Sequence, residues 1–186
     1  MRMTAAQDRK TVRARAGPGW PGWPDWLAWL TAICTGLATA GPAHAGASCS
    51  IAANGVNFGI YDPMLAGADV SAGTVTVICA YVPPGATNVS YSIVLSPGMN
   101  SATAAARRMA AGTSRLGYNV FRDSAYSTIW GNGLNGTVLA TGSMTVGPGV
   151  GNGTRTAIHT LYGRIPGLQD VLPGNYVDTL VLSLNY

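Results

Sequence analysis

The sequence contains no glutamate and a single lysine, Lys10. Residues 1–45 hold five of the eleven basic residues, so the formal net charge of +4 comes mostly from the amino terminus. After residue 45, six arginines face five aspartates. A nucleic-acid interface needs a dense basic stripe that displaces counterions from phosphates. Six scattered arginines do not provide one, and we expect no nucleic-acid partner.

The scarcity of charge does not indicate disorder. Only 10% of the residues are charged, whereas 47% are hydrophobic. Disordered chains are typically charged and poor in β-branched residues. Glu and Lys, two strong helix formers, are missing after residue 45, while valine, threonine, serine and glycine are abundant. This composition favours a single all-β domain with a buried core.

The amino terminus has the pattern of a secretion signal. Residues 2–15 are basic, residues 26–38 are apolar, and Ala43-His44-Ala45 offers a small-x-small cleavage site. The apolar stretch is shorter than the ~20 residues of a membrane-spanning helix. We therefore predict a signal peptide over residues 1–45, cleaved after Ala45, and an exported domain over residues 46–186.

Export determines how the cysteines are interpreted. Cys34 would leave with the signal peptide, so that Cys49 and Cys79 remain. An even pair of cysteines in an oxidising compartment predicts a disulfide. A metal site would need further ligands close by, and no histidine lies near this pair. We predict a structural disulfide and no metal.

Alternation of apolar and polar residues predicts most of the strands. The alternation is clear over residues 74–81, 89–95, 116–121 and 176–186, and weaker over 50–58, 128–130, 141–146 and 156–162. Turn sequences rich in proline and glycine, such as Pro83-Pro84-Gly85, separate them. Strands at this spacing indicate a β-sandwich. The alanine-rich stretch 101–111 is compatible with a short helix or a loop.

Several motifs follow Cys49 in a fixed order. They are Phe58-Gly59-Ile60-Tyr61-Asp62-Pro63, Ser71–Cys79, Leu116–Asp123, Ile129-Trp130-Gly131, Gly163-Arg164-Ile165-Pro166, Gln169-Asp170-Val171 and Gly174–Leu180. Together they make the sequence from Cys49 to Tyr186 resemble the spore coat protein U domain. That family includes pilin subunits of the archaic chaperone–usher pathway.

The resemblance implies an immunoglobulin-like sandwich that lacks its last strand and leaves an open hydrophobic groove. A periplasmic chaperone would lend a strand, which the amino-terminal extension of a neighbouring pilin-like subunit would replace after delivery to an usher. Strand addition of this kind combines backbone hydrogen bonds with pockets for alternate side chains. The expected location is the periplasm in transit, then the cell surface or the extracellular space, as part of a pilus or a coat.

The carboxyl-terminal strand is the candidate for one wall of that groove. Leu180, Leu182, Leu184 and Tyr186 share one face, and we predict that they line the groove and contact the chaperone. The alternative is a core strand in a complete sandwich, which would bury the leucines equally well. Only Gly46-Ala47-Ser48 would precede Cys49 after cleavage, so we expect a subunit that accepts a strand rather than one that donates a strand.

Catalytic and cofactor patterns are missing. His159 is the one histidine after residue 45, and no Gly-x-Ser-x-Gly elbow, metal-ligand cluster or phosphate-binding loop accompanies it. We predict a non-enzymatic structural subunit without catalytic residues or cofactor. The alternative is a secreted adhesin-like domain in which Trp130, Tyr81 or Tyr126 binds a carbohydrate or a surface. Trp130 would otherwise fill the core.

Overall fold

The computed structural model describes residues 2–6 and 46–186. Most of the elements in these residues are strands, and a single 3-10 turn, η1 (Gly151–Gly153), precedes β8. The strands are β1 (Arg2–Ala6), β2 (Gly46–Asn54), β3 (Asp69–Val82), β4 (Thr87–Leu95), β5 (Arg107–Ala111), β6 (Ser114–Phe121), β7 (Ala140–Val146), β8 (Thr154–Ile165) and β9 (Thr179–Asn185). None of the described residues forms a helix long and apolar enough to cross a membrane.

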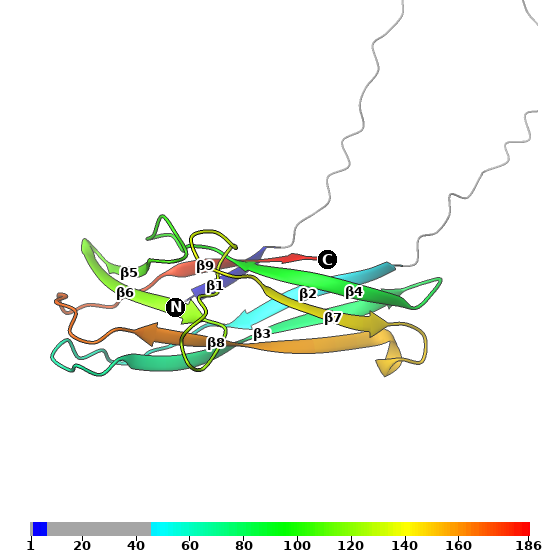
Figure 1. Ribbon diagram of the computed structural model, residues 1–186, viewed down its shortest axis with the longest axis horizontal. Coiled ribbons are helices and arrows are strands. Elements are labelled where there is room, and N and C mark those ends of the chain that lie inside the picture. Colours follow the sequence, from blue (N-terminus) through cyan, green and yellow to red (C-terminus); the bar gives the residue numbers. More distant parts are fainter. Residues whose placement is uncertain (1, 7–45) are drawn as a thin grey trace, which may run out of the picture. The chain divides into compact units, whose positions relative to one another are not determined.

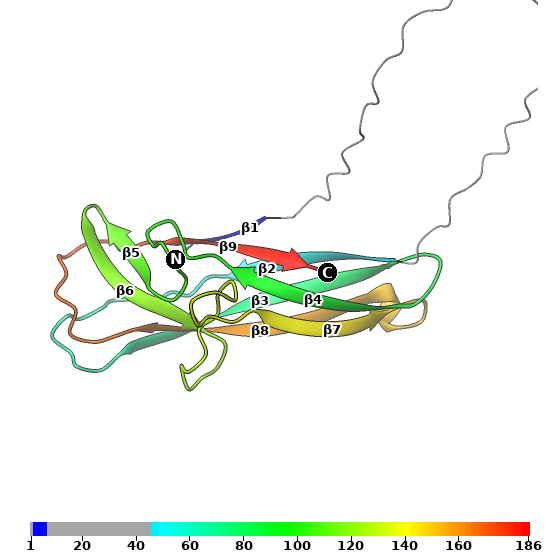
Figure 2. The same cartoon turned by 45° about the horizontal axis from the view of Figure 1, so that its top comes forward.

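The strands form two sheets that pack face to face (Figures 1 and 2). One sheet has the order β1-β9-β4-β7, and the other has the order β2-β3-β8-β6-β5. All pairs are antiparallel except β1 and β9, which are parallel. The predicted all-β sandwich is therefore confirmed.

Side-chain alternation places the core between the two sheets. In β3, Val75 and Val77 are fully buried, whereas Thr74 and Thr76 are only half-buried on the opposite face. In β4 the odd-numbered residues from Val89 to Leu95 are buried, and the serines between them face outward. Successive side chains of a strand point to opposite faces, so each sheet contributes one apolar face to the core.

The structure corrects the expectation for the alanine-rich stretch. Residues 107–111 form neither a helix nor a loop; they are strand β5, which pairs with β6. The inward residues of β5 are Arg107 and Met109, both at least 97% buried. The period-2 signal was hidden because one of the two core positions is an arginine.

Trp130 belongs to the core. It is fully buried, and its indole Nε1 donates a hydrogen bond of 3.1 Å to the carbonyl oxygen of Ile93. It therefore fills the sandwich and cannot contact an external ligand. Its neighbourhood pairs only through isolated bridges, Phe121 to Ile129 and Trp130 to Val138, in place of the short strand expected there.

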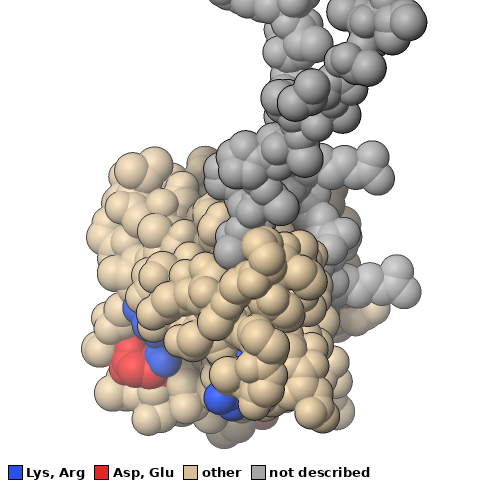
Figure 3. Space-filling view, turned by 90° about the vertical axis from the view of Figure 1, so that its right-hand side faces the viewer, with Lys and Arg blue, Asp and Glu red and all other residues tan. Residues whose placement is uncertain are grey.

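Charged side chains are sparse on the folded domain. Figure 3 looks onto one end of the domain, where most of the visible surface carries no charge. Two of the charged residues are buried, since Arg107 is 1% exposed and Asp178 is 2% exposed. Solvent-facing positions on the sheets are mostly serine, threonine, alanine and asparagine, as the composition after residue 45 predicts.

Candidate functional site

β9 turns its leucines into the sandwich. Leu180 and Leu182 are fully buried and Leu184 is 7% exposed, whereas Val181 between them is 38% exposed. Tyr186, predicted on the same face, lies beyond the end of β9 and is 55% exposed. The leucines therefore form a continuous apolar wall, and the tyrosine does not extend it.

One side of the β9 backbone is hydrogen-bonded to β4. The amide of Ser96 donates to the carbonyl oxygen of Val181 at 3.0 Å, and Val94 lies opposite Ser183. In an antiparallel pair only alternate residues exchange hydrogen bonds with the partner strand. The N–H and C=O groups of the intervening leucines consequently point away from β4, toward the outer edge of the sheet.

That outer edge carries another strand of the same chain. β1 pairs in parallel with β9, from Arg2 opposite Thr179 to Ala6 opposite Ser183, and it also lies close to β2 (Figure 2). β1 belongs to the segment predicted as the signal peptide. The edge expected to stand open is thus occupied over five residues of β9 by the chain itself.

β2 forms the opposite wall and is the end strand of the second sheet. Its inward residues include Cys49 and Ile51, which are 6% and 9% exposed. Cys49 lies opposite Cys79 of β3, and the two form the predicted disulfide. We call the side of the sandwich between β2 and β9 the inter-sheet groove; in the full chain β1 pairs with β9 there, and Leu180 and Leu182 are fully buried. Its β2 wall is therefore covalently attached to the neighbouring strand.

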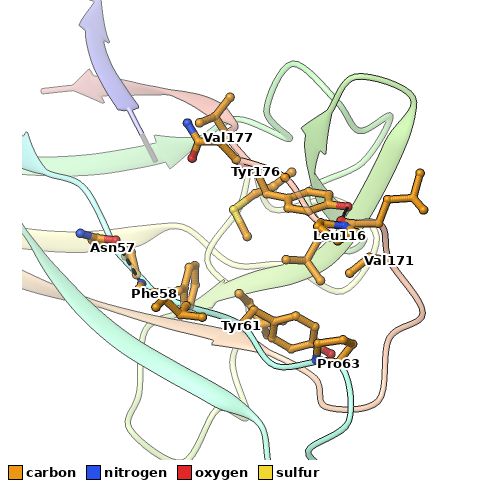
Figure 4. Close-up of a pocket in the computed structure, with 17 residues that line it drawn as sticks. Asn57, Phe58, Tyr61, Pro63, Leu116, Val171, Tyr176 and Val177 are labelled. Carbon is orange, nitrogen blue, oxygen red and sulfur yellow. Dashed lines mark hydrogen bonds between the residues drawn. The ribbon is translucent and has the colours of Figure 1, made fainter.

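A pocket of about 480 Å³ lies beyond β2 and β9, and none of its lining residues belongs to either strand. The chain that follows β2 forms one side and the chain that precedes β9 forms the other. Figure 4 shows Phe58 and Tyr61 on the first side and Tyr176 and Val177 on the second. Core side chains, Leu116 among them, also line the pocket. None of the lining residues is charged, so the pocket suits an apolar or neutral group.

Hydrogen bonds fix the two sides of this pocket. The Tyr61 hydroxyl donates to the carbonyl oxygen of Pro166 at 3.0 Å, and the Tyr176 hydroxyl donates to that of Leu172 at 2.6 Å. The exposed apolar side chain of Ile60 stands at the rim. The Phe58–Pro63 and Gly174–Leu180 motifs, which lie far apart in sequence, therefore meet at one place. Sequence reasoning identified both motifs but had no means of bringing them together.

Asp178 anchors the start of β9. Its carboxylate accepts hydrogen bonds from the Tyr118 hydroxyl at 2.7 Å and from the Met99 amide, the Asn100 side chain and the Thr179 amide, each at 3.0 Å. Burial, reinforced by this carboxylate, raises the pKa of Tyr118 far above its usual range. Tyr118 therefore stays neutral and acts as a hydrogen-bond donor.

Arg107 lies buried beside this carboxylate. Its guanidinium donates to the carbonyl oxygen of Ser96 at 2.8 Å and to Oδ1 of Asn119 at 2.8 Å. Burial lowers its pKa to about 10, and the nearby Tyr118 and Asp178 oppose that change. Arg107 remains cationic at neutral pH and connects β5 to the end of β4.

His159 links the two sheets. Its Nε2 lies 3.0 Å from the Tyr91 hydroxyl, and its ring packs edge-on against Trp130 at 6.1 Å between centroids. Burial, followed by the charge of Arg122, lowers its pKa. Its hydrogen bond goes to a tyrosine rather than to a nucleophile or an orienting carboxylate, so its surroundings do not resemble a catalytic triad. Within residues 46–186 no three His, Cys, Asp or Glu side chains gather as metal ligands would.

The comparisons with known proteins agree with the resemblance of the sequence. The model of the Spore Coat Protein U domain matches residues 34–183. The chain belongs to this family. One relative, Protein U of Myxococcus xanthus, is 29% identical over 154 residues, covering 77% of this chain and 80% of the relative.

A solved structure resembles this chain at lower sequence identity. It is a chaperone–tip adhesion subunit pre-assembly complex from archaic chaperone–usher Csu pili of Acinetobacter baumannii. The similarity has a TM-score of 0.48 and 21% identity, and it covers 75% of this chain. The present chain spans 40% of the matched chain.

One residue of the family motifs has a role that the sequence did not predict. The side chain of Gln169 pairs with the backbone of Gly117 in both directions, accepting from its N–H at 2.7 Å and donating to its C=O at 2.9 Å. β8 ends at Ile165, so this amide takes the place of a neighbouring strand along β6. The Gln169 side chain thus supplies, at Gly117, the hydrogen bonds that the backbone of a longer β8 would otherwise make.

Proposed function

We propose that this chain is a structural, non-catalytic subunit of a secreted surface assembly, completed by a strand from another chain. The strand enters the inter-sheet groove along the outer edge of β9. A periplasmic chaperone supplies it first, and a neighbouring pilin-like subunit then replaces it at the usher. The assembly is a chaperone–usher pilus or a coat layer on the cell surface.

The observation that carries this proposal is the double orientation of β9. Leu180, Leu182 and Leu184 turn their side chains toward the core and their backbone N–H and C=O groups away from β4. An incoming strand can therefore bind the backbone and cover the leucines at the same time, as strand addition requires. The parallel pairing of β1 supports the proposal, because this edge accommodates an added strand without disturbing β4.

The position of β1 within the proposed signal peptide supports an order of steps on export. β1 lies within residues 1–45, which we propose to be the signal peptide removed on export. Cleavage after Ala45 takes β1 away and leaves the outer edge of β9 available to a partner. An exposed apolar strand edge promotes aggregation, so the processed chain needs a chaperone at that stage.

Co-expression tests the proposal. The chain is produced with its signal peptide, with and without a periplasmic chaperone from the same genome, and the periplasmic fraction is analysed by size exclusion and intact mass. We expect a stable heterodimer whose subunit begins at Gly46, and aggregation or degradation when the chaperone is omitted. A processed chain that stays soluble, monomeric and fully folded alone would show that no donated strand is needed.

A further inference from the structure

A second hollow lies on the outer face of the sheet, at the opposite edge of the sheet from β2. It has a volume of about 400 Å³ and is lined by residues of β5, β6 and β8 and the chain beside them. The lining residues whose side chains face outward include Arg108, Phe121 and Arg164, with Pro166 beside them. The hollow is separate from the inter-sheet groove, and nothing in the proposed function uses it.

The strand register places two arginines around a space. Arg108 lies opposite Gly117, and Arg164 lies opposite Asn119, so the two arginines stand on the strands that flank β6. Strands in a sheet are about 4.8 Å apart, which puts the backbones of these two strands about 10 Å from each other. Gly117 between them has no side chain, and the side chain of Gln169 lies against its backbone.

The hollow is electropositive. No aspartate or glutamate lines it, and both outward arginines are exposed. Arg107 also lines it but turns its guanidinium inward to Ser96 and Asn119. Arg108 and Arg164 are therefore the two cationic groups that a ligand in the hollow can reach. A guanidinium pairs best with the two oxygens of a carboxylate or phosphate group.

Aromatic rings border the same hollow. Phe121 lines it, and the ring of Tyr126 packs edge-on against Phe121 and Tyr162 at 5.6 and 6.5 Å between centroids. The guanidinium carbon of Arg164 lies 5.7 Å from the centre of the Tyr126 ring. The aromatic cluster therefore holds one of the two arginines in place.

The loop that carries Tyr126 is built around a strained residue. Tyr126 has a φ of 56°, a left-handed conformation that is uncommon for a bulky side chain. Asp123 stabilises the loop by accepting hydrogen bonds from the amides of Ala125, Ser127 and Thr128. Backbone strain of this kind often occurs at ligand sites. Here it fixes an aromatic ring beside the hollow.

We infer that this hollow binds an acidic saccharide, with the carboxylates of uronic acid residues on Arg108 and Arg164. The ring of the sugar packs against Phe121 and the carboxylate groups of neighbouring sugars meet the two arginines. The ring of Phe121 beside the two arginines favours a sugar ring that carries carboxylates over a small inorganic anion, which would use the arginines alone. A carboxylated polysaccharide of a cell surface or matrix is then a ligand of the folded domain, independently of how the inter-sheet groove is filled.

Calorimetric titration with trigalacturonate tests this inference, using the full chain in the form in which it is produced. Methyl-esterified trigalacturonate has the same size and no charge, and it serves as the matched ligand. We expect saturable binding of the acid and none of the ester. Arg108→Gln and Arg164→Gln should each weaken binding about tenfold, the loss of one charge-assisted contact.

Arg115→Gln is the control variant, because Arg115 is exposed on β6 outside the hollow and bonds only to its own turn, at the carbonyl oxygens of Gly112 and Ser114. It removes the same charge and should change the affinity less than twofold. An equal loss in this variant, equal binding of the ester, or no binding of trigalacturonate at millimolar concentration would overturn the inference. Triglutamate binding as tightly as trigalacturonate would overturn the assignment to a saccharide.

Discussion

Individual polar residues decide how β9 begins. A buried carboxylate is tolerated only when hydrogen bonds replace its lost hydration. Asp178 has four such donors, which come from the chain before β5, from β6 and from β9 itself. One side chain thus fixes the position from which the leucine wall of the inter-sheet groove starts.

Replacing Asp178 with asparagine should destabilise the domain by about 2–3 kcal/mol, because hydrogen bonds to a charged acceptor are lost in a buried site. The free energy of unfolding in urea measures the change. Asp170→Asn is the matched control, since Asp170 is exposed, and it should shift stability by less than about 0.5 kcal/mol. Equal effects of the two substitutions would contradict the anchoring role.

His159 makes stability depend on pH. The folded state holds the pKa of His159 below its value in the unfolded chain, near 6.5. As pH falls below 6.5, the unfolded chain takes up the proton first, so the free energy of unfolding declines until the folded pKa is reached. Between pH 7.5 and 5.5 the urea midpoint of the wild type should fall more than that of His159→Gln, which can still bond to Tyr91. Parallel declines in both proteins would rule out this histidine as the cause.

At the scale of elements, the sequence predicts strands where alternation is undisturbed and fails where a polar residue enters the core. β3, β4 and β9 could be read directly from their apolar periodicity. β5 could not, because the inward Arg107 interrupts the apolar alternation. The sequence does not show that Ser96 and Asn119 accept hydrogen bonds from the Arg107 guanidinium. The expected strand at 176–186 begins only at Thr179, since Val177 bridges to Ala110 of β5 and both Tyr176 and Val177 line the pocket.

Gln169 tests whether a side chain can complete a sheet. Gln169→Ala leaves the N–H and C=O of Gly117 without their partner, and we expect a loss of about 1–2 kcal/mol. Amide exchange at Gly117 should accelerate strongly, while exchange at Phe121, which lies opposite Tyr162 of β8, stays slow. Gln169→Glu keeps the acceptor and loses the donor, so its effect should be smaller. Unchanged exchange at Gly117 in the alanine variant would contradict the pairing.

The disulfide stabilises the wall that β2 contributes. Cys49 and Cys79 are 30 residues apart in sequence, and closing a loop of that size lowers the entropy of the unfolded chain. The double variant Cys49→Ala/Cys79→Ala should lose about 3–4 kcal/mol in urea unfolding. Exchange should increase most along β2, the end strand of its sheet. A uniform increase over both sheets would indicate global destabilisation without a specific role for β2.

At the scale of the whole molecule, the sequence predicted the architecture but not the places where distant segments meet. The family motifs and the strand count indicated a sandwich with a leucine wall. The pocket between the chain after β2 and the chain before β9 depends on Phe58 and Tyr176, which are brought together only by the packing of both sheets. The hollow between Arg108 and Arg164 depends likewise on the register of three strands. Long-range registers of this kind leave no local pattern in a sequence.

The central claim is that the outer edge of β9 receives a strand from another chain. Residue-resolved amide exchange of the processed chain, alone and bound to its chaperone, tests it most directly. The amides of Leu180, Leu182 and Leu184 should slow on the order of 100-fold in the complex, whereas those of Val181 and Ser183, on the β4 side, should be slow in both. Leucine amides that exchange at the same rate with and without the chaperone would contradict the claim.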